Sequence, residues 1–280
     1  MRVIMFARKP VACDALEYML SMNATIVCIV TDPPDPRSIH KRNLYDVAVS
    51  HDIPVVDEQV LYDSLRTKSY VNCPDLSDID LVISMFHQRR IRKPVLGMAS
   101  IGEINIHPAP LPEFQGWGVY NMAILENTPY WGASAHFMDE GFDTGPLIDQ
   151  ERFDVDMSRE TCLSLEQRTQ PAVDTLFRRV FDKALQHGKL DGSPQVGGRT
   201  IRKSDFLQLR QIQPDDSAEL ISRKIRAFWY PPYQGATITL HGTQYTILDD
   251  RMMQALGSEL FDCDVQSSDA IRAWIRASTQ

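Results

Sequence analysis

Short apolar runs alternate with amphipathic stretches along the first half of the chain. Residues 3–6, 25–31 and 80–85 are apolar runs of strand length, and residues 53–56 form a shorter one. Between them, helical spacing follows Pro10 and covers residues 43–50. This alternation predicts an α/β fold with a Rossmann-like, mostly parallel sheet whose strands are joined by helical crossovers.

The pattern changes after residue 100. A strand at 105–107 follows a short helix predicted at 93–98, and a helix is expected over 118–125. The apolar stretches 133–137 and 147–153 are close in sequence, which favours an antiparallel hairpin with Asp143 in its connection. A long helix is predicted over 158–187, and we expect Pro171 to kink or divide it.

Glycine and proline then mark residues 188–198 as a linker. The region beyond contains a helical pattern over 217–227 and two short strands at 237–240 and 244–248, separated by a turn sequence. We therefore expect a main domain over residues 1–190, a small β-containing C-terminal domain over 199–250, and an extension of unassigned role over 251–280.

Polar side chains gather where the strand at 105–107 ends. Alternation places Asn105 and His107 on the same face of this strand, and the prolines from Pro108 onward stop it. Ligands bind at the carboxyl ends of strands in open α/β sheets. An amide donor and an imidazole, joined by the carboxylate of Asp143, would suit acyl transfer. Taken alone, an Asn-x-His at a strand end is more often a structural hydrogen-bonding pair than a catalytic one.

Two blocks of sequence carry a family resemblance, INIHPAPLPEFQG over 104–116 and GASAHFMDEGFDTGPLI over 132–148. They resemble the signature of the formyltransferases that use 10-formyltetrahydrofolate, among them the enzymes acting on methionyl-tRNA, glycinamide ribonucleotide and sugar nucleotides. The resemblance implies that Asn105 stabilises a developing oxyanion, His107 accepts a proton and Asp143 orients His107. It also implies 10-formyltetrahydrofolate as the cofactor.

The resemblance extends to residues 1–20, 80–96, 198–201 and 225–236, which are similar to the tRNA-type and sugar-type branches. The sugar branch is the closest. By this resemblance, and by their places at strand ends and loops, we assign cofactor binding to Met85, Phe86, Asp139, Gly141 and Phe142. Substrate binding is assigned to Arg8, Lys9, Gln115, Gly116, Trp229, Tyr230 and Tyr233.

Several of these assignments have plainer alternatives. Met85 and Phe86 are also typical of core residues, and Asp139 of a solvated turn. Trp229, Tyr230 and Tyr233 can stack on a nucleotide base, but an aromatic and proline cluster also packs domains together. Basic residues at a helix start, of which Arg89 is the first, suggest an anion site for the glutamate tail of the cofactor.

The net charge and one sequence position narrow the choice of acceptor molecule. The net charge of −8 argues against nucleic acid as a partner, and Gln115 stands where tRNA-type members usually have an arginine. Basic residues around 199–203 and 223–226 form either a phosphate-binding patch or a solvated face. The 5 cysteines are scattered, so we expect neither a disulfide framework nor a metal site.

We therefore expect a cytoplasmic enzyme without a membrane span or signal peptide. Its predicted reaction moves a formyl group to the amine of a dTDP- or GDP-linked amino-deoxysugar, for lipopolysaccharide O-antigen biosynthesis, and a homodimer is implied by the resemblance. The alternatives are formylation of methionyl-tRNA, a hydroxylated ornithine or glycinamide ribonucleotide, hydrolysis of the formyl group, and a non-catalytic folate- or nucleotide-binding module.

Overall fold

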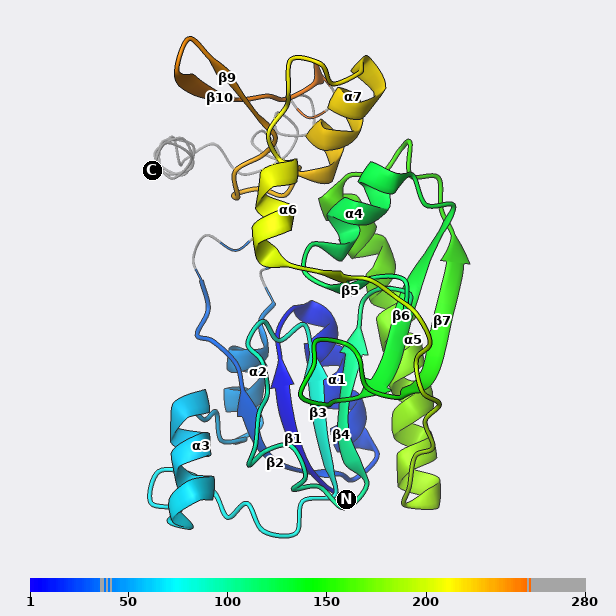
Figure 1. Ribbon diagram of the computed structural model, residues 1–280. Coiled ribbons are helices and arrows are strands. Elements are labelled where there is room, and N and C mark those ends of the chain that lie inside the picture. The colour runs from blue at the N-terminus through cyan, green and yellow to red at the C-terminus, as the bar shows by residue number, and fades with distance from the viewer. Residues whose placement is uncertain (36–37, 39, 41, 251, 253–280) are drawn as a thin grey trace. The chain divides into compact units, whose positions relative to one another are not determined.

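A six-stranded mixed sheet lies at the centre of the first of two compact units (Figure 1). This computed structural model describes residues 1–35, 38, 40, 42–250 and 252. The strand order is β2-β1-β3-β4-β6-β7, in which β1 to β4 run parallel and β6 and β7 are antiparallel to their neighbours. The predicted Rossmann-like sheet with an antiparallel hairpin is confirmed. The strands are β1 (Arg2–Ala7), β2 (Thr25–Val30), β3 (Leu81–Met85), β4 (Gly102–His107), β6 (Tyr130–Phe137) and β7 (Leu147–Asp154).

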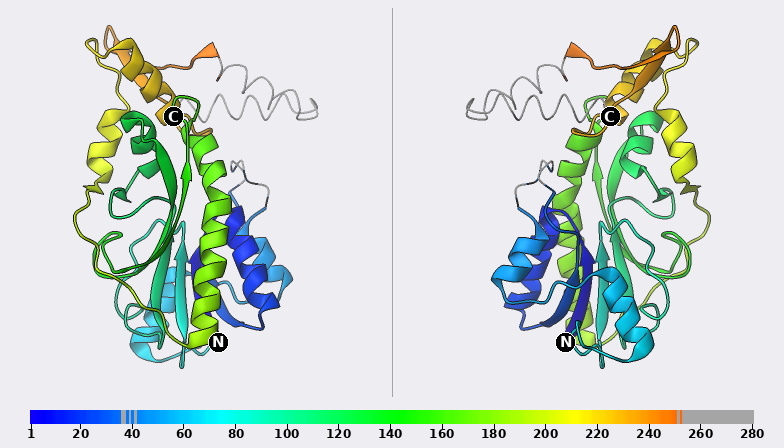
Figure 2. Two further views of the ribbon diagram at one scale, coloured as in Figure 1. Left: turned by 90° about the vertical axis from the view of Figure 1, so that its right-hand side faces the viewer. Right: turned by 90° about the vertical axis from the view of Figure 1, so that its left-hand side faces the viewer.

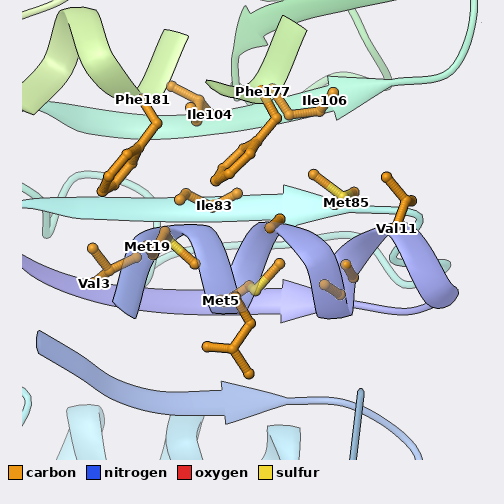
Figure 3. Close-up of a cluster of buried hydrophobic side chains, with 14 of the residues drawn as sticks. Val3, Met5, Val11, Met19, Ile83, Met85, Ile104, Ile106, Phe177 and Phe181 are labelled. Atoms are coloured by element: carbon orange, nitrogen blue, oxygen red, sulfur yellow. The ribbon is translucent and has the colours of Figure 1, made fainter. Parts of the chain in front are cut away.

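Helices cover both faces of this sheet (Figure 2). On one face, α1 (Pro10–Ser21), α2 (Leu44–Ser50) and α5 (Cys162–His187) bury their apolar sides against the strands. Figure 3 shows Phe177 and Phe181 of α5 over Ile83, Ile104 and neighbouring side chains. On the other face, α3 (Glu58–Thr67) and residues 91–99 close a second core. Burial on both faces explains why β1 to β3 are nearly continuous apolar runs.

The helix boundaries follow from local chemistry. α1 has Pro10 in its first turn, where a missing N–H costs nothing. The carboxylate of Asp57 caps α3 by accepting from the N–H groups of Gln59 and Val60, and Lys68 ends this helix in a left-handed conformation. α3 was not among the predicted elements, although the Asp57 cap is a signal for it.

Three predicted elements differ from those observed. Residues 53–56 form one isolated bridge, Ile29 to Val55, instead of a strand. Residues 93–98 form turns rather than a helix, and Gly97 leaves the helical region with a φ of 93°. α5 begins at Cys162 and continues through Pro171 without division. A proline inside a helix costs ~3 kcal/mol, but each fully buried side chain such as Phe177 contributes ~1.5–3 kcal/mol, so packing against the sheet outweighs the defect.

The second unit consists of residues 117–129, 155–167 and the described residues from 201 onward. It contains α4 (Val119–Glu126), α6 (Lys203–Leu209), α7 (Ala218–Ala227) and the hairpin of β9 (Thr237–Leu240) and β10 (Thr243–Thr246). Two segments that precede residue 199 belong to it, because α4 packs on α7 and the N–H of Leu163 donates to the carbonyl of Trp229 at 3.2 Å. The predicted extension 251–280 lies outside the described residues except for residue 252.

Candidate active site

The side chains of Asn105 and His107 converge on one carboxylate oxygen of Asp143. Nδ2 of Asn105 lies 3.2 Å from Oδ1 of Asp143, and Nδ1 of His107 lies 3.5 Å from the same atom. Asn105 and His107 come from the carboxyl end of β4, and Asp143 from the connection between β6 and β7. The structure therefore brings together the three side chains that sequence analysis singled out.

The loop that carries Asp143 is shaped by its own side chains. The carboxylate of Asp139 accepts from the N–H of Gly141 at 2.9 Å and from the hydroxyl of Thr144 at 2.8 Å. A Cβ on Gly141 would lie 1.9 Å from that hydroxyl oxygen, so only glycine fits. Asp143 itself has a φ of 57°, a left-handed conformation that is uncommon for residues with a side chain. The loop thus holds its carboxylate in a constrained position.

One tautomer of His107 fits its surroundings. Nε2 of His107 lies 2.8 Å from the carbonyl oxygen of Phe114, which can only accept, so Nε2 donates. In the neutral ring, Nδ1 then carries a lone pair facing Asp143. Burial lowers the pKa of His107, and the nearby Asp143 opposes this shift. His107 is therefore a neutral base whose free nitrogen would be stabilised by Asp143 once it takes up a proton.

His136 is a fourth member of this cluster and was not predicted. It lies opposite Asn105 in the β4 and β6 pairing, with Nε2 at 3.2 Å from Nδ2 of Asn105 and 3.4 Å from Oδ1 of Asp143. Its Nδ1 lies 2.7 Å from the carbonyl oxygen of Phe137 and so donates to it, which leaves Nε2 as an acceptor. The signal in the sequence was a histidine within the second of the two blocks that carry the family resemblance, on a strand of otherwise small, aromatic and apolar residues.

The amide of Asn105 is accordingly fully used. Its nitrogen faces a carboxylate and an unprotonated imidazole nitrogen, which both accept, so each of its two hydrogens has a partner. The backbone N–H of Gly116 donates to the other oxygen of Asp143 at 2.9 Å. Burial disfavours the charged carboxylate, but a proton on His107 or His136 and the Gly116 N–H favour it, and the pKa of Asp143 lies well below its usual range. Asp143 remains ionised.

The proline-rich loop after β4 is fixed by side chains of the hairpin. The hydroxyl of Ser134, opposite His107 in register, donates to the carbonyl of Ala109 at 2.8 Å and accepts from the N–H of Leu111 at 2.9 Å. Gln150 donates to the carbonyl of Leu111 at 2.6 Å. Ser134 and Gln150 are structural residues that position the loop beside the site, and neither was predicted.

The side chains assigned to cofactor binding differ in their accessibility. Met85 is fully buried in the core, so a ligand can reach only its backbone (Figure 3). Phe86 follows β3 with a φ of 56°, which is unusual for a bulky residue and turns the chain sharply at the sheet edge. The Phe142 side chain is 43% exposed, beside the Asp139 and Gly141 turn. Their part in cofactor binding remains a prediction.

The basic residues after β3 are paired with protein groups. Arg89 donates to Asp32 at 3.2 Å and also contacts Glu58. The guanidinium of Arg90 lies 5.5 Å from the centre of the Phe142 ring, and Lys93 lies 3.4 Å from Glu140. The anion-site hypothesis is therefore weakest for Arg89, whose charge is already neutralised, and stays open for Arg90 and Lys93.

The residues assigned to substrate binding in the first unit lie at two places. Arg8, after β1, is 3.5 Å from Asp32, and Lys9 has its Nζ 3.3 Å from Nε2 of His40. Lys9 has a φ of 74° and ψ of 157°, a region that is almost restricted to glycine. Gln115 and Gly116 form β5, where Gln115 is buried and Gly116 donates to Asp143.

The aromatic residues of the second unit share little exposed surface. Trp229 is buried, and the hydroxyl of Tyr230 donates to Oε1 of Glu166 at 2.8 Å. Burial and Glu166 raise the pKa of Tyr230. Tyr233 is 69% exposed and its ring centre lies 5.8 Å from that of Tyr230. Of the three side chains, Tyr233 is therefore the one that offers an open ring to a ligand.

Part of the basic patch expected in the second unit is internal. Lys224 is buried and donates to Asp216 at 2.5 Å and to the carbonyl of Gln211. Arg226 is buried and donates to the carbonyls of Glu160 and Met157. These charges hold the unit together, so they cannot form a phosphate-binding face.

The cysteines, possible metal ligands and helices of the described residues indicate neither a metal site nor a membrane span. The four described cysteines are buried free thiols, at positions 13, 28, 73 and 162. Over the same residues, no group of three or more histidine, cysteine or carboxylate side chains could hold a metal ion. Nor is any described helix both long and apolar enough to cross a membrane.

Comparison with known proteins gives three informative similarities. The chain is 25% identical to the methionyl-tRNA formyltransferase of Wolbachia pipientis subsp. Culex pipiens, over 89% of this chain and 80% of the relative. It is 32% identical to the GDP-perosamine N-formyltransferase of Brucella melitensis, over 61% of this chain and 64% of the relative. The solved N-formyltransferase of Helicobacter canadensis, in complex with folinic acid and dTDP-3-aminofucose, has the same fold, with a TM-score of 0.67, 19% identity and coverage of 86% and 85%.

A family model adds a broader match. The model described as formyl transferase matches residues 3–181, which is more than half of the chain and includes the whole Asn105, His107 and Asp143 cluster. The chain therefore belongs to the formyl transferase family, and its activity is formyl transfer.

Proposed function

We propose that this protein transfers a formyl group from 10-formyltetrahydrofolate to the amino group of a nucleotide-linked amino sugar. The observation that carries the proposal is that Asn105 and His107 both lie within 3.5 Å of one carboxylate oxygen of Asp143. An amine acceptor must lose a proton while a carbonyl oxygen gains charge, and the cluster contains a group for each event.

We assign the proton to Nδ1 of His107. This nitrogen is the unprotonated one, because Nε2 donates to Phe114. Asp143, which stays ionised, stabilises the resulting imidazolium at 3.5 Å. General base catalysis contributes ~10²–10⁴ in rate. The carbonyl of Phe114 keeps the ring in the orientation that this transfer needs. When the bond between the formyl carbon and the donor nitrogen breaks, His107 would give the proton to that nitrogen and return to its neutral form.

Asn105 is assigned to the carbonyl oxygen that gains charge. Both of its amide hydrogens have protein partners in the structure, so one of them must exchange its partner for that oxygen. Once His107 is protonated, it donates to Asp143 more strongly than the Asn105 amide does. The Asn105 hydrogen that faced Asp143 is then free to donate to the carbonyl oxygen of the formyl group. Proton uptake by His107 and donation by Asn105 are thereby linked. A single such donor is worth ~2.7–4 kcal/mol.

The folate is assigned to the loop of Asp143 and the carboxyl end of β3. Phe142 is 43% exposed and Phe86 turns the chain at the sheet edge, so both aromatic side chains suit a flat pterin ring. Arg90, which lies over Phe142, would attract a carboxylate of the folate tail. When bound, 10-formyltetrahydrofolate supplies the formyl group. Folate-bound relatives of the same fold support this choice.

The choice of a sugar nucleotide over tRNA rests on two observations. The net charge of −8 opposes a polyanion as large as tRNA. Lys224 and Arg226, which could have formed a basic face, are buried in internal contacts. The GDP-perosamine N-formyltransferase relative points to a sugar nucleotide, whereas the methionyl-tRNA formyltransferase relative favours the alternative.

Contacts with the substrate are assigned to Arg8, Lys9 and Gly116. Lys9 occupies a strained backbone position where glycine would fit better, which suggests that its charged side chain is kept for binding. The open ring of Tyr233 suits stacking on a base, an interaction worth ~1–3 kcal/mol.

The test supplies 10-formyltetrahydrofolate with separate pools of dTDP- and GDP-linked amino sugars, methionyl-tRNA, hydroxylated ornithine and glycinamide ribonucleotide. Mass spectrometry of each acceptor identifies the formylated product, and release of tetrahydrofolate without product reveals hydrolysis. We expect formylation of at least one amino-sugar nucleotide. Turnover on methionyl-tRNA with none on any sugar nucleotide would overturn the proposal.

A further inference from the structure

The segment predicted as a linker lies against the loops of the candidate site. The Ser193 N–H and carbonyl pair with Leu147 at 2.8 Å, and the carbonyl of Arg199 accepts from the N–H of Gln115 at 3.3 Å. A Cβ on Gly198 would lie 2.4 Å from the carbonyl oxygen of Pro112, so this backbone approaches the proline-rich loop as closely as glycine allows. We call residues 193–200 the strap.

Gln195 of the strap binds the Asp143 loop through its side chain. Its Nε2 donates to the carbonyl of Asp143 at 2.9 Å and to the carbonyl of Gly145 at 2.7 Å. Its Oε1 accepts from Nε2 of Gln115 at 3.1 Å, and Oε1 of Gln115 accepts from the hydroxyl of Thr200 at 3.0 Å. Both donor hydrogens of the Gln195 amide are therefore directed at the Asp143 loop, and its oxygen accepts from Gln115.

The two carbonyls that Gln195 binds belong to a strained residue, Asp143, and to Gly145, two residues later. Asp143 is left-handed, and its carboxylate is buried among His107, His136 and Asn105. The loop could relieve the backbone strain by turning the carboxylate towards water. The Gln195 amide opposes this movement by holding the carbonyl of Asp143 itself and that of Gly145, whereas Asp139 holds the loop through the N–H of Gly141 and the hydroxyl of Thr144.

We propose that Gln195 is a positioning residue for formyl transfer, which holds the backbone carbonyls of Asp143 and Gly145 so that the Asp143 carboxylate stays beside His107. The inference rests on the proposed role of the Asn105, His107 and Asp143 cluster. In this role Gln195 acts through Asp143. Its loss affects catalysis because a displacement of about 1 Å in a catalytic group costs up to ~10²-fold in rate.

The experiment compares Gln195→Leu and Gln195→Glu with Gln186→Leu. The first two remove both donor hydrogens with little change in shape, and the third removes an exposed amide from α5. We expect kcat to fall about 10- to 100-fold in both Gln195 variants, with the KM for the formyl donor nearly unchanged. Gln186→Leu should match the unaltered protein. Circular dichroism and thermal unfolding identify a variant that has failed to fold.

A double-mutant comparison separates positioning from a general loss of stability. If Gln195 acts through Asp143, Asp143→Asn combined with Gln195→Leu should be no slower than Asp143→Asn alone. A further loss in the double variant equal to that caused by Gln195→Leu alone would overturn the inference.

The titration of His107 provides a readout that needs no acceptor. Asp143 raises the pKa of His107, so a displaced carboxylate should lower it. NMR of labelled histidine should show the His107 pKa in Gln195→Leu shifted down towards its value in Asp143→Asn. An unchanged titration would overturn the inference. If the unaltered protein formylates no sugar nucleotide, the proposed function fails, and this titration still decides the role of Gln195.

Discussion

Two buried histidine and carboxylate pairs lie at the carboxyl edge of the same sheet. Nδ1 of His107 is 3.5 Å from Asp143, and Nε2 of His87, after β3, is 3.5 Å from Glu58 at the start of α3. The imidazoles are 7% and 3% exposed, and each carboxylate is 14% exposed. Burial lowers the pKa of both histidines. By distance and burial alone, the pairs are equivalent.

The other partners of each carboxylate distinguish them. Glu58 is also bound by Arg89, which in turn contacts Asp32, so its charge is neutralised before His87 takes up a proton. Asp143 is held by the amide of Asn105 and the N–H of Gly116, which stabilise its charge without cancelling it. A carboxylate held by neutral donors can still stabilise an imidazolium, whereas one bound by a guanidinium does so weakly.

The imidazoles differ in the same sense. A carbonyl fixes the tautomer of His107 and leaves one nitrogen free for a proton. Within the described residues, Nε2 of His87 has no hydrogen-bond partner, and its ring packs edge-on against Phe6 at 5.4 Å. His87 behaves as a core aromatic residue. The other partners of a histidine and carboxylate pair therefore indicate its chemistry better than the distance between the two groups.

Removing each imidazole should give the largest contrast. We expect His107→Asn to lower kcat by ~10²–10⁴, the contribution of a general base, and His87→Asn to leave kcat near the unaltered value. Steady-state formylation assays on both variants measure the difference. Equal losses in the two variants would mean that the His107–Asp143 pair has no special role.

Neutralising each carboxylate in turn should change the pH dependence of kcat/KM for one pair and not for the other. Formyl transfer needs neutral His107, so kcat/KM falls as pH drops through its pKa, which lies below the usual 6.5. Because Asp143 raises that pKa, Asp143→Asn should move the acid limb to lower pH while reducing the plateau. Glu58→Gln should leave the limb in place. A shift towards higher pH in Asp143→Asn would contradict the assignment.

A substitution of Lys9, which follows β1 at the same edge of the sheet, should have a smaller effect on stability and substrate binding. Lys9→Gly should relieve backbone strain of order 1–3 kcal/mol, less a glycine entropy cost of about 0.5–1, and so raise the free energy of unfolding by about 1 kcal/mol. It should also raise the KM for the nucleotide substrate. Lys68→Gly, which replaces a left-handed residue at the end of α3, is the matched control for denaturant unfolding and should not change the KM.

The smallest expected effect comes from making the second pair resemble the first. Arg89 lowers the pKa of His87 and Glu58 raises it, so Arg89→Met should raise the pKa of His87. Arg90→Met is the control, and NMR titration measures both. A fall in the His87 pKa would show that Arg89 does not neutralise Glu58. kcat should stay near that of the unaltered protein in Arg89→Met.

Sequence reasoning was most successful where neighbours along the chain decide the outcome. The apolar runs predicted β1 to β3, and the period of two residues placed Asn105 and His107 on one face of β4. The same reasoning was wrong at 93–98, where only turns form, because one helical turn has too few hydrogen bonds to persist without further packing.

Contacts between segments that are distant along the chain could not be predicted from the sequence. His136 joins the site because β6 runs antiparallel to β4 in one register, and a shift of a single residue would turn its side chain to the other face. Gln195 lies in a stretch whose glycines and proline suggested a linker, yet its amide is bound to a loop 50 residues away.

The sequence by itself determined the fold class, the strand that presents Asn105 and His107, and the family. Only the tertiary structure decided which charges remain available, pairing Arg89 with Glu58 and Asp32 while leaving Asp143 to neutral donors. The physical reason is that alternation and helical period act over a few residues, whereas a pKa depends on every group within a few ångströms, whatever its position in the chain.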